Sequence, residues 1–152
     1  MRTDSYDMGD GRFVQRLAAP VTIRDASSVA TYITKCIFPH PEEYTQEEMW
    51  ALLFNCRGQI THEVMVSRGS LDASLAHPSM IFRDAIRLGA AKVLVTHNHP
   101  SGDPDPSSAD VLLTQRLRDA GEILGIPILD HVIVAHGAWY SLAEHDWCPS
   151  HT

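Results

Sequence analysis

The sequence predicts an α/β protein in which helices pack on a mixed β-sheet. Strand-like segments follow one another directly in the first half of the chain, as in an antiparallel hairpin, and alternate with helical segments in the second half, as in β-α-β units. A length of 152 residues, with 44% hydrophobic and 20% charged side chains, suits one globular domain. No apolar run approaches the ~18 residues of a membrane span, so a transmembrane helix is excluded. The ordinary globular composition also excludes a disordered chain and a coiled coil.

In the first half of the chain, a helix and two strands are predicted. Residues 27–37 repeat an apolar side chain every fourth position, and Asp25 or Ser27 can cap the start of this helix. Residues 48–55 and 59–67 read as strands joined by a turn at Gly58, which makes a hairpin. The second strand alternates between one side with Ile60, His62, Val64 and Val66 and another with Thr61, Glu63, Met65 and Ser67.

In the second half, helical and strand patterns alternate, and glycines follow both predicted helices. The segment that follows the most β-rich run holds one Gly and three Pro residues, which exclude regular structure there. Helices are predicted at 79–88 and 107–124, strands at 91–96, 126–134 and 139–142, and a loop at 98–106.

The domain organisation, charge and cysteines set the broad class. We expect a flexible N-terminus over residues 1–11, a single domain over 12–145 and a C-terminal tail over 146–152. Because 12 basic residues face 19 acidic ones, the net charge is −7, which does not favour nucleic acid as a partner. Three widely spaced cysteines and an N-terminus without an apolar signal-like segment favour a cytoplasmic protein with free thiols.

Two histidines and an aspartate form a candidate metal site. His97 and His99 stand where a predicted strand ends, and Asp110 falls in the first turn of the following helix. Two imidazoles and a carboxylate suit Zn²⁺ and leave one coordination position open, as in catalytic sites, where the pKa of a bound water falls to about 7. We expect Glu63, a carboxylate on a half-apolar strand, to serve as the general base.

Each of these residues also has a structural interpretation. Ser107 and Asp110 form an S-x-x-D pattern that a helix start produces as a capping box. A His-x-His pair alone is a weak signal, and Glu63 could be a solvated strand residue. Asp103 and Asp105 are alternative ligands, although each precedes a proline in a tight loop. His131 is interpreted as a residue packed in the core or beside a ligand.

The combined pattern resembles a known family. His97-x-His99, followed by Ser107 and Asp110 and preceded by Glu63 on a strand, resembles the signature of the JAMM (MPN+) metalloproteases. The strings HNHPSGDP at 97–104, RGSLD at 68–72 and LDHVI at 129–133 are closer to its RadC-like branch, and the resemblance covers about residues 15–145.

The resemblance implies a cytidine-deaminase-like α/β/α sandwich, Zn²⁺ held by His97, His99 and Asp110, and catalysis by Glu63 and Ser107. It also implies a peptidase whose substrate is a protein or peptide, such as a ubiquitin-like tail. Deaminase activity is excluded, because that zinc site needs a P-C-x-x-C motif besides H-x-E, and this sequence has no P-C-x-x-C. Two alternatives remain: a non-peptidase metal-bearing module associated with DNA repair or mobile elements, and a metal-dependent nuclease.

Overall fold

Seven strands form one sheet in the computed structural model, which describes residues 2–7, 13–69 and 77–147. The strand order is β1-β2-β4-β3-β5-β6-β7. Neighbouring strands pair antiparallel except β5 and β6, which are parallel. The strands are β1 (Arg2–Asp7), β2 (Phe13–Thr22), β3 (Glu48–Phe54), β4 (Gln59–Arg68), β5 (Lys92–Asn98), β6 (Ile128–Ala135) and β7 (Ala138–Ser141).

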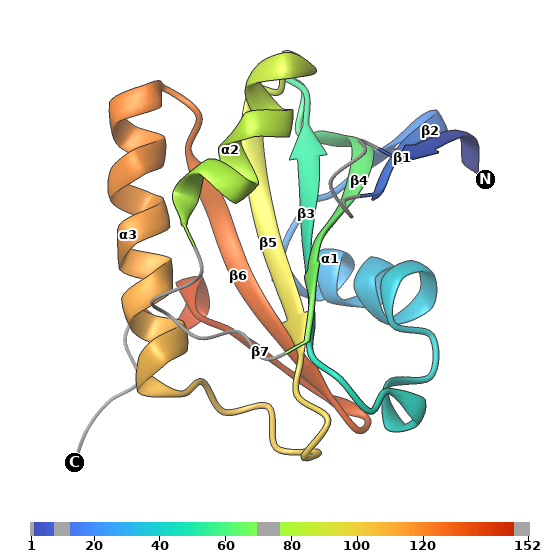
Figure 1. The fold of residues 1–152 in the computed structure, drawn as a ribbon, viewed down its shortest axis with the longest axis vertical. Helices are drawn as coiled ribbons and strands as arrows, with labels where there is room; N and C mark the ends of the chain where they lie inside the picture. The colour runs from blue at the N-terminus through green and yellow to red at the C-terminus, as the bar shows by residue number, and fades with distance from the viewer. Residues whose placement is uncertain (1, 8–12, 70–76, 148–152) are drawn as a thin grey trace.

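Helices cover both faces of this sheet. Helices α2 (Pro78–Arg87) and α3 (Ser108–Leu124) lie on one face, and α1 (Ala26–Tyr32) lies on the other (Figure 1). Helix α1 begins at Asp25, whose side chain accepts a hydrogen bond from the Ser28 amide, and it continues as a π-helical turn over Ile33–Ile37. The predicted α/β/α sandwich around a mixed sheet is therefore confirmed. No helix in the described part of the chain is long and apolar enough to cross a membrane.

The N-terminal segment differs from the prediction. Arg2–Asp7 forms β1 and pairs with β2, whereas the sequence predicts a flexible segment over 1–11. A polar, Gly- and Asp-rich sequence carries no strand signal by itself, so pairing with the longer strand β2 decides its conformation. Residues 1 and 8–12 lie outside the described part of the structure, as do 70–76 and 148–152, which hold part of the RGSLD string and most of the predicted tail.

Two hydrophobic clusters, one on each face, fix which side every strand residue takes. Val64, Val93 and Val95 pack beneath α2 and α3, whereas Leu52 and Leu94 pack beneath α1. The prediction that Ile60 shares a face with Val64 and Val66 is wrong, because Ile60 packs on the α1 side. Phe54 pairs with Ile60 but Leu53 pairs with His62, so Thr61 is an extra residue that reverses the alternation.

The β5–α3–β6 unit places the candidate site at one end of the sheet. Strand β5 is central and buried, and it ends at Asn98. The chain then crosses to α3, which starts behind the N-cap Ser107 and ends at Gly125 with φ 71°. A residue with a side chain is strained in this left-handed conformation, which explains the glycine that the sequence shows there. The carboxyl end of β5 and the first turn of α3 therefore face each other.

Candidate metal centre

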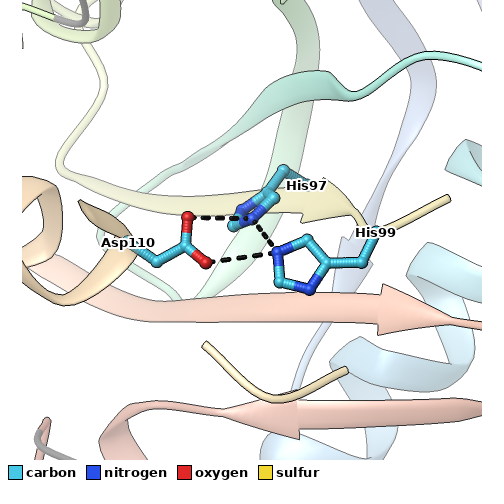
Figure 2. Close-up of side chains that lie close together, drawn as sticks. All are labelled: His97, His99 and Asp110. Carbon is cyan, nitrogen blue, oxygen red and sulfur yellow. Dashed lines mark hydrogen bonds and ion pairs between the residues drawn. The ribbon is translucent and has the colours of Figure 1, made fainter. Parts of the chain in front are cut away.

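Three predicted ligands converge between β5 and α3. The Nε2 atoms of His97 and His99 lie 3.0 Å apart. The carboxylate of Asp110 bridges them, with Oδ1 3.3 Å from His97 Nε2 and Oδ2 3.2 Å from His99 Nε2 (Figure 2). Their ligand atoms all lie within 4.8 Å of one another, so a single ion can contact all three. The structure therefore brings together the three residues that the sequence predicts as ligands.

The end of β5 determines where the two imidazoles point. His97 shares the side of the strand that carries Val93 and Val95, so its fully buried ring points toward α3. His99 follows the last strand residue, and its ring Nδ1 donates a hydrogen bond to the carbonyl oxygen of Asp103 at 2.9 Å. This bond turns the ring back, so its Nε2 faces the same point as that of His97.

Asp110 is held by the start of α3. The Ser107 Oγ accepts from the Asp110 amide at 3.1 Å, and the Ser107 amide donates to Asp110 Oδ2 at 2.8 Å, which is a reciprocal capping box. The two interpretations of Asp110 are therefore compatible, since the bond that caps the helix also aims the carboxylate at the imidazoles. The side chain of Ser107 lies beside this group, in an exposed residue.

The charges of the group stabilise one another. Burial alone would raise the pKa of Asp110, but hydrogen bonds with His97 and His99 outweigh it and hold this pKa well below its ordinary value. Burial alone would lower the pKa of His99, but bonds to Asp110 and to the Asp103 carbonyl, together with the charge of Glu47, raise it instead. A negative carboxylate among imidazoles thus creates a potential that favours a cation.

The second nitrogen of His97 faces another histidine. His97 Nδ1 lies 2.7 Å from Nε2 of His131 on β6, and the Nδ1 of His131 lies 2.6 Å from the Thr114 hydroxyl on α3. All three residues are fully buried, and burial lowers the pKa of His131 well below its ordinary value. His131 therefore lies beside a ligand, in agreement with one of its two interpretations.

Glu63 does not join the group. It pairs with Leu52 on β3, and Leu52 pairs with Leu94 on β5, all on the face beneath α1. Its Oε2 accepts a hydrogen bond of 2.5 Å from the Tyr32 hydroxyl of α1. The expected position of Glu63 beside the ligands is therefore wrong, because the sheet separates the two. The alternation of β4 was visible in the sequence, but which face of β4 matches His97 depends on strand register.

Glu47 is a carboxylate near the group that the sequence pattern did not single out. Met49 pairs with His97 across β3 and β5, so continuing this register by two residues places Glu47 opposite His99. Its negative charge contributes to the raised pKa of His99, which agrees with this position. The buried Asn98 holds the backbone on both sides of Glu47, because its Oδ1 accepts from the Glu48 amide and its Nδ2 donates to the Gln46 carbonyl. The signal in the sequence that could have identified Glu47 was its position immediately before the strand predicted at 48–55.

The donor set fits a metal ion. A carbonyl oxygen only accepts, so the proton of neutral His99 sits on Nδ1 and its Nε2 carries a lone pair. His99 Nε2 lies 3.0 Å from His97 Nε2 and 3.2 Å from Asp110 Oδ2. A cation between these atoms would stabilise the arrangement, because it attracts both the lone pair and the carboxylate. Residues His97, His99 and Asp110 would hold the ion, and two imidazoles with one carboxylate oxygen match the ligands that Zn²⁺ prefers.

Fold and site together define a metal-dependent α/β/α domain. A family model described as the RadC-like JAB domain matches residues 23–147, which include His97, His99 and Asp110. The chain therefore belongs to the RadC-like JAB domain family.

Several curated relatives support this assignment. The chain is 40% identical over 125 residues to a UPF0758 protein of Methanococcoides burtonii, a match that covers 82% of this chain and 53% of the relative. It is 47% identical over 108 residues to a UPF0758 protein of Trichlorobacter lovleyi, a match that covers 70% of this chain and 47% of the relative. A UPF0758 protein of Listeria monocytogenes is 43% identical over 110 residues, and the match covers 72% of this chain and 49% of the relative. The chain thus spans about half the length of these relatives.

Proposed function

We propose that this protein is a zinc-dependent hydrolase of peptide or isopeptide bonds. The observation that supports it most is the convergence of His97 Nε2, His99 Nε2 and the Asp110 carboxylate on one point. The bond from His99 Nδ1 to the Asp103 carbonyl and the capping box of Ser107 and Asp110 orient these side chains without an ion, which lowers the cost of ordering the ligands. A bound zinc ion supplies Lewis-acid chemistry that stabilises negative charge on a carbonyl oxygen.

In this proposal Glu47, in place of Glu63, is the general base. A carboxylate opposite His99 can accept a proton from the attacking water and later donate it to the leaving amine. Asn98 keeps the peptide of Glu47 in place through bonds of 2.6 Å to the Glu48 amide and 3.1 Å to the Gln46 carbonyl. Glu48 is less suited, because it bonds to Trp50 and Arg68.

Ser107 can stabilise charge during the reaction. Its Oγ accepts a hydrogen bond from the Asp110 amide, so the hydroxyl proton is available to a second acceptor. We propose that this proton is donated to the carbonyl oxygen of the substrate as negative charge develops there. A positioned donor of this kind contributes roughly 3–4 kcal/mol to transition-state stabilisation.

The test compares two carboxylate variants of the zinc-loaded protein. Glu47→Gln should keep zinc but lower turnover of a peptide or ubiquitin-tail isopeptide substrate by about 10²–10⁴-fold, the usual contribution of a general base. Glu63→Gln is the matched control, because it makes the same chemical change beneath α1, and it should retain activity. Zinc content is measured on both variants and on His97→Ala, which should lose the ion.

Two results would contradict the proposal. One is wild-type protein that binds no stoichiometric divalent metal, and the other is metal-loaded protein that cleaves none of these substrates. A parallel assay on nucleic acid, with and without chelator, distinguishes the nuclease alternative, which the net charge of −7 does not favour.

A further inference from the structure

A chain of buried polar groups runs from the backbone of α3 to His97. The Thr114 hydroxyl donates to the Asp110 carbonyl oxygen at 2.7 Å and lies 2.6 Å from His131 Nδ1. His131 Nε2 lies 2.7 Å from His97 Nδ1. Thr114, His131 and His97 each have no exposed surface, so no solvent is available to replace a missing partner. Every contact in the chain therefore needs its own proton.

Only one arrangement of protons satisfies all three contacts. The Asp110 carbonyl can only accept, so the hydroxyl proton of Thr114 points to it, and the Thr114 oxygen then accepts from His131 Nδ1–H. Neutral His131 consequently has a lone pair on Nε2, which accepts from Nδ1–H of His97. The reverse direction would leave the oxygens of Thr114 and Asp110 with facing lone pairs at 2.7 Å.

This direction decides which nitrogen of His97 is free to bind. With its proton on Nδ1, His97 presents an unprotonated Nε2 to the point that His99 and Asp110 share. We propose that Thr114 and His131 are positioning residues that fix this tautomer of His97 and thereby set the affinity of the site for metal. The inference rests on the proposed metal site and extends it to two residues that do not contact the ion.

The contrast with His99 explains why His97 needs such a device. His99 donates to a backbone carbonyl, which has one hydrogen-bonding role, so its tautomer is fixed directly. His97 instead faces an imidazole nitrogen, which can donate or accept. The tautomer of His97 therefore depends on that of His131, which depends in turn on Thr114. The hydroxyl proton of Thr114 is fixed because it points to a backbone carbonyl oxygen.

The test uses three variants at two positions. Thr114→Val keeps the shape of the side chain but removes the acceptor of His131 Nδ1–H. His131 can then shift its proton to Nε2 and donate to His97, which moves the His97 proton onto the metal-binding nitrogen. Thr114→Ser retains a hydroxyl and is the matched rescue variant, and His131→Phe removes the chain while keeping an aromatic ring in the core.

The first readout is the tautomer of His97 in the metal-free protein, measured by long-range ¹H–¹⁵N NMR correlation. Wild type and Thr114→Ser should show Nδ1–H, and Thr114→Val should show Nε2–H. The second readout is zinc affinity, measured by competition with a chromophoric chelator. Thr114→Val and His131→Phe should bind about 10–100-fold more weakly than wild type, and Thr114→Ser should remain close to it.

An Nε2–H tautomer in wild-type protein would overturn the inference, as would unchanged zinc affinity in both Thr114→Val and His131→Phe. The wild-type NMR measurement decides the question even if a variant does not fold. Failure of the proposed function is a separate result, since it would appear as wild-type protein that binds no zinc or cleaves no substrate while the tautomer is still Nδ1–H.

Discussion

Gly102 offers the sharpest test of how the loop after β5 supports the metal centre. Its φ of +91° lies in the left-handed region, and a Cβ there would stand 2.9 Å from Nδ1 of the His136 ring. The Gly102 amide donates to the His99 carbonyl at 3.1 Å, and the next residue, Asp103, accepts from the ring of His99. Gly102→Ala should therefore disturb the bond that orients a ligand.

The magnitude follows from two separate costs. Holding alanine at this φ costs about 1–3 kcal/mol. The contact with His136 costs less, about 0.5–1.5 kcal/mol, because this residue is exposed and its ring can rotate away. The backbone term should dominate. We expect the unfolding midpoint of the metal-free protein to fall by about 2–4 °C per kcal/mol, and zinc affinity to fall by about 10–100-fold.

The assay pairs thermal unfolding with chelator competition, and the double variant Gly102→Ala/His136→Ala serves as the control. Removing the ring eliminates the contact but leaves the φ, so the double variant should recover only the smaller part of the loss. Full recovery in the double variant would refute the reasoning from φ. Wild-type zinc affinity in Gly102→Ala would refute the link between this loop and His99.

Three further predictions concern stability and pH. Leu117→Ala, at a fully buried position on α3, should lower the free energy of unfolding by about 2–5 kcal/mol in urea titrations. Tyr32→Phe removes the hydroxyl that donates to buried Glu63, so it should cost about 1–3 kcal/mol without loss of turnover, whereas a loss of turnover would return Glu63 to the mechanism. Because the pKa of His99 is raised above 6.5, its charged form stabilises the metal-free fold below that pH, and this stability is lost as pH rises through the folded-state pKa. Zinc affinity should change in the opposite sense and weaken as pH falls, because protons compete for His99, and titrations on both sides of the ordinary His pKa would check the two signs.

Much of the fold was predictable from local patterns. The hairpin of β3 and β4, the helix from Ser108 and the stop at Gly125 follow from alternation, capping and a residue that tolerates positive φ. Strand β1 was missed, because its sequence acquires strand character only beside β2. The extra residue at Thr61 was also missed, since nothing in the sequence of β4 marks where pairing with β3 slips by one residue.

The cluster of candidate metal ligands was predictable for a related reason. His97 and His99 are joined by a single residue, and Asp110 stands in the first turn of a helix whose start the sequence marks, so short stretches of chain fix most of their relative positions. The carboxylate that we propose as the general base was not predictable in this way. Glu47 and Glu63 both belong to the hairpin region, and each could be imagined beside the ligands.

The sequence by itself thus determined the fold class and the His97, His99 and Asp110 set, because spacing along the chain and helix capping are local properties. Only the tertiary structure decided that the β3–β5 register brings Glu47 toward His99 while Glu63 lies beneath α1. It also decided that His131 and Thr114 stand behind His97. The physical reason is strand register: the pairing of β3 with β5 and of β5 with β6 sets cross-strand neighbours, and side-chain direction alternates with every residue.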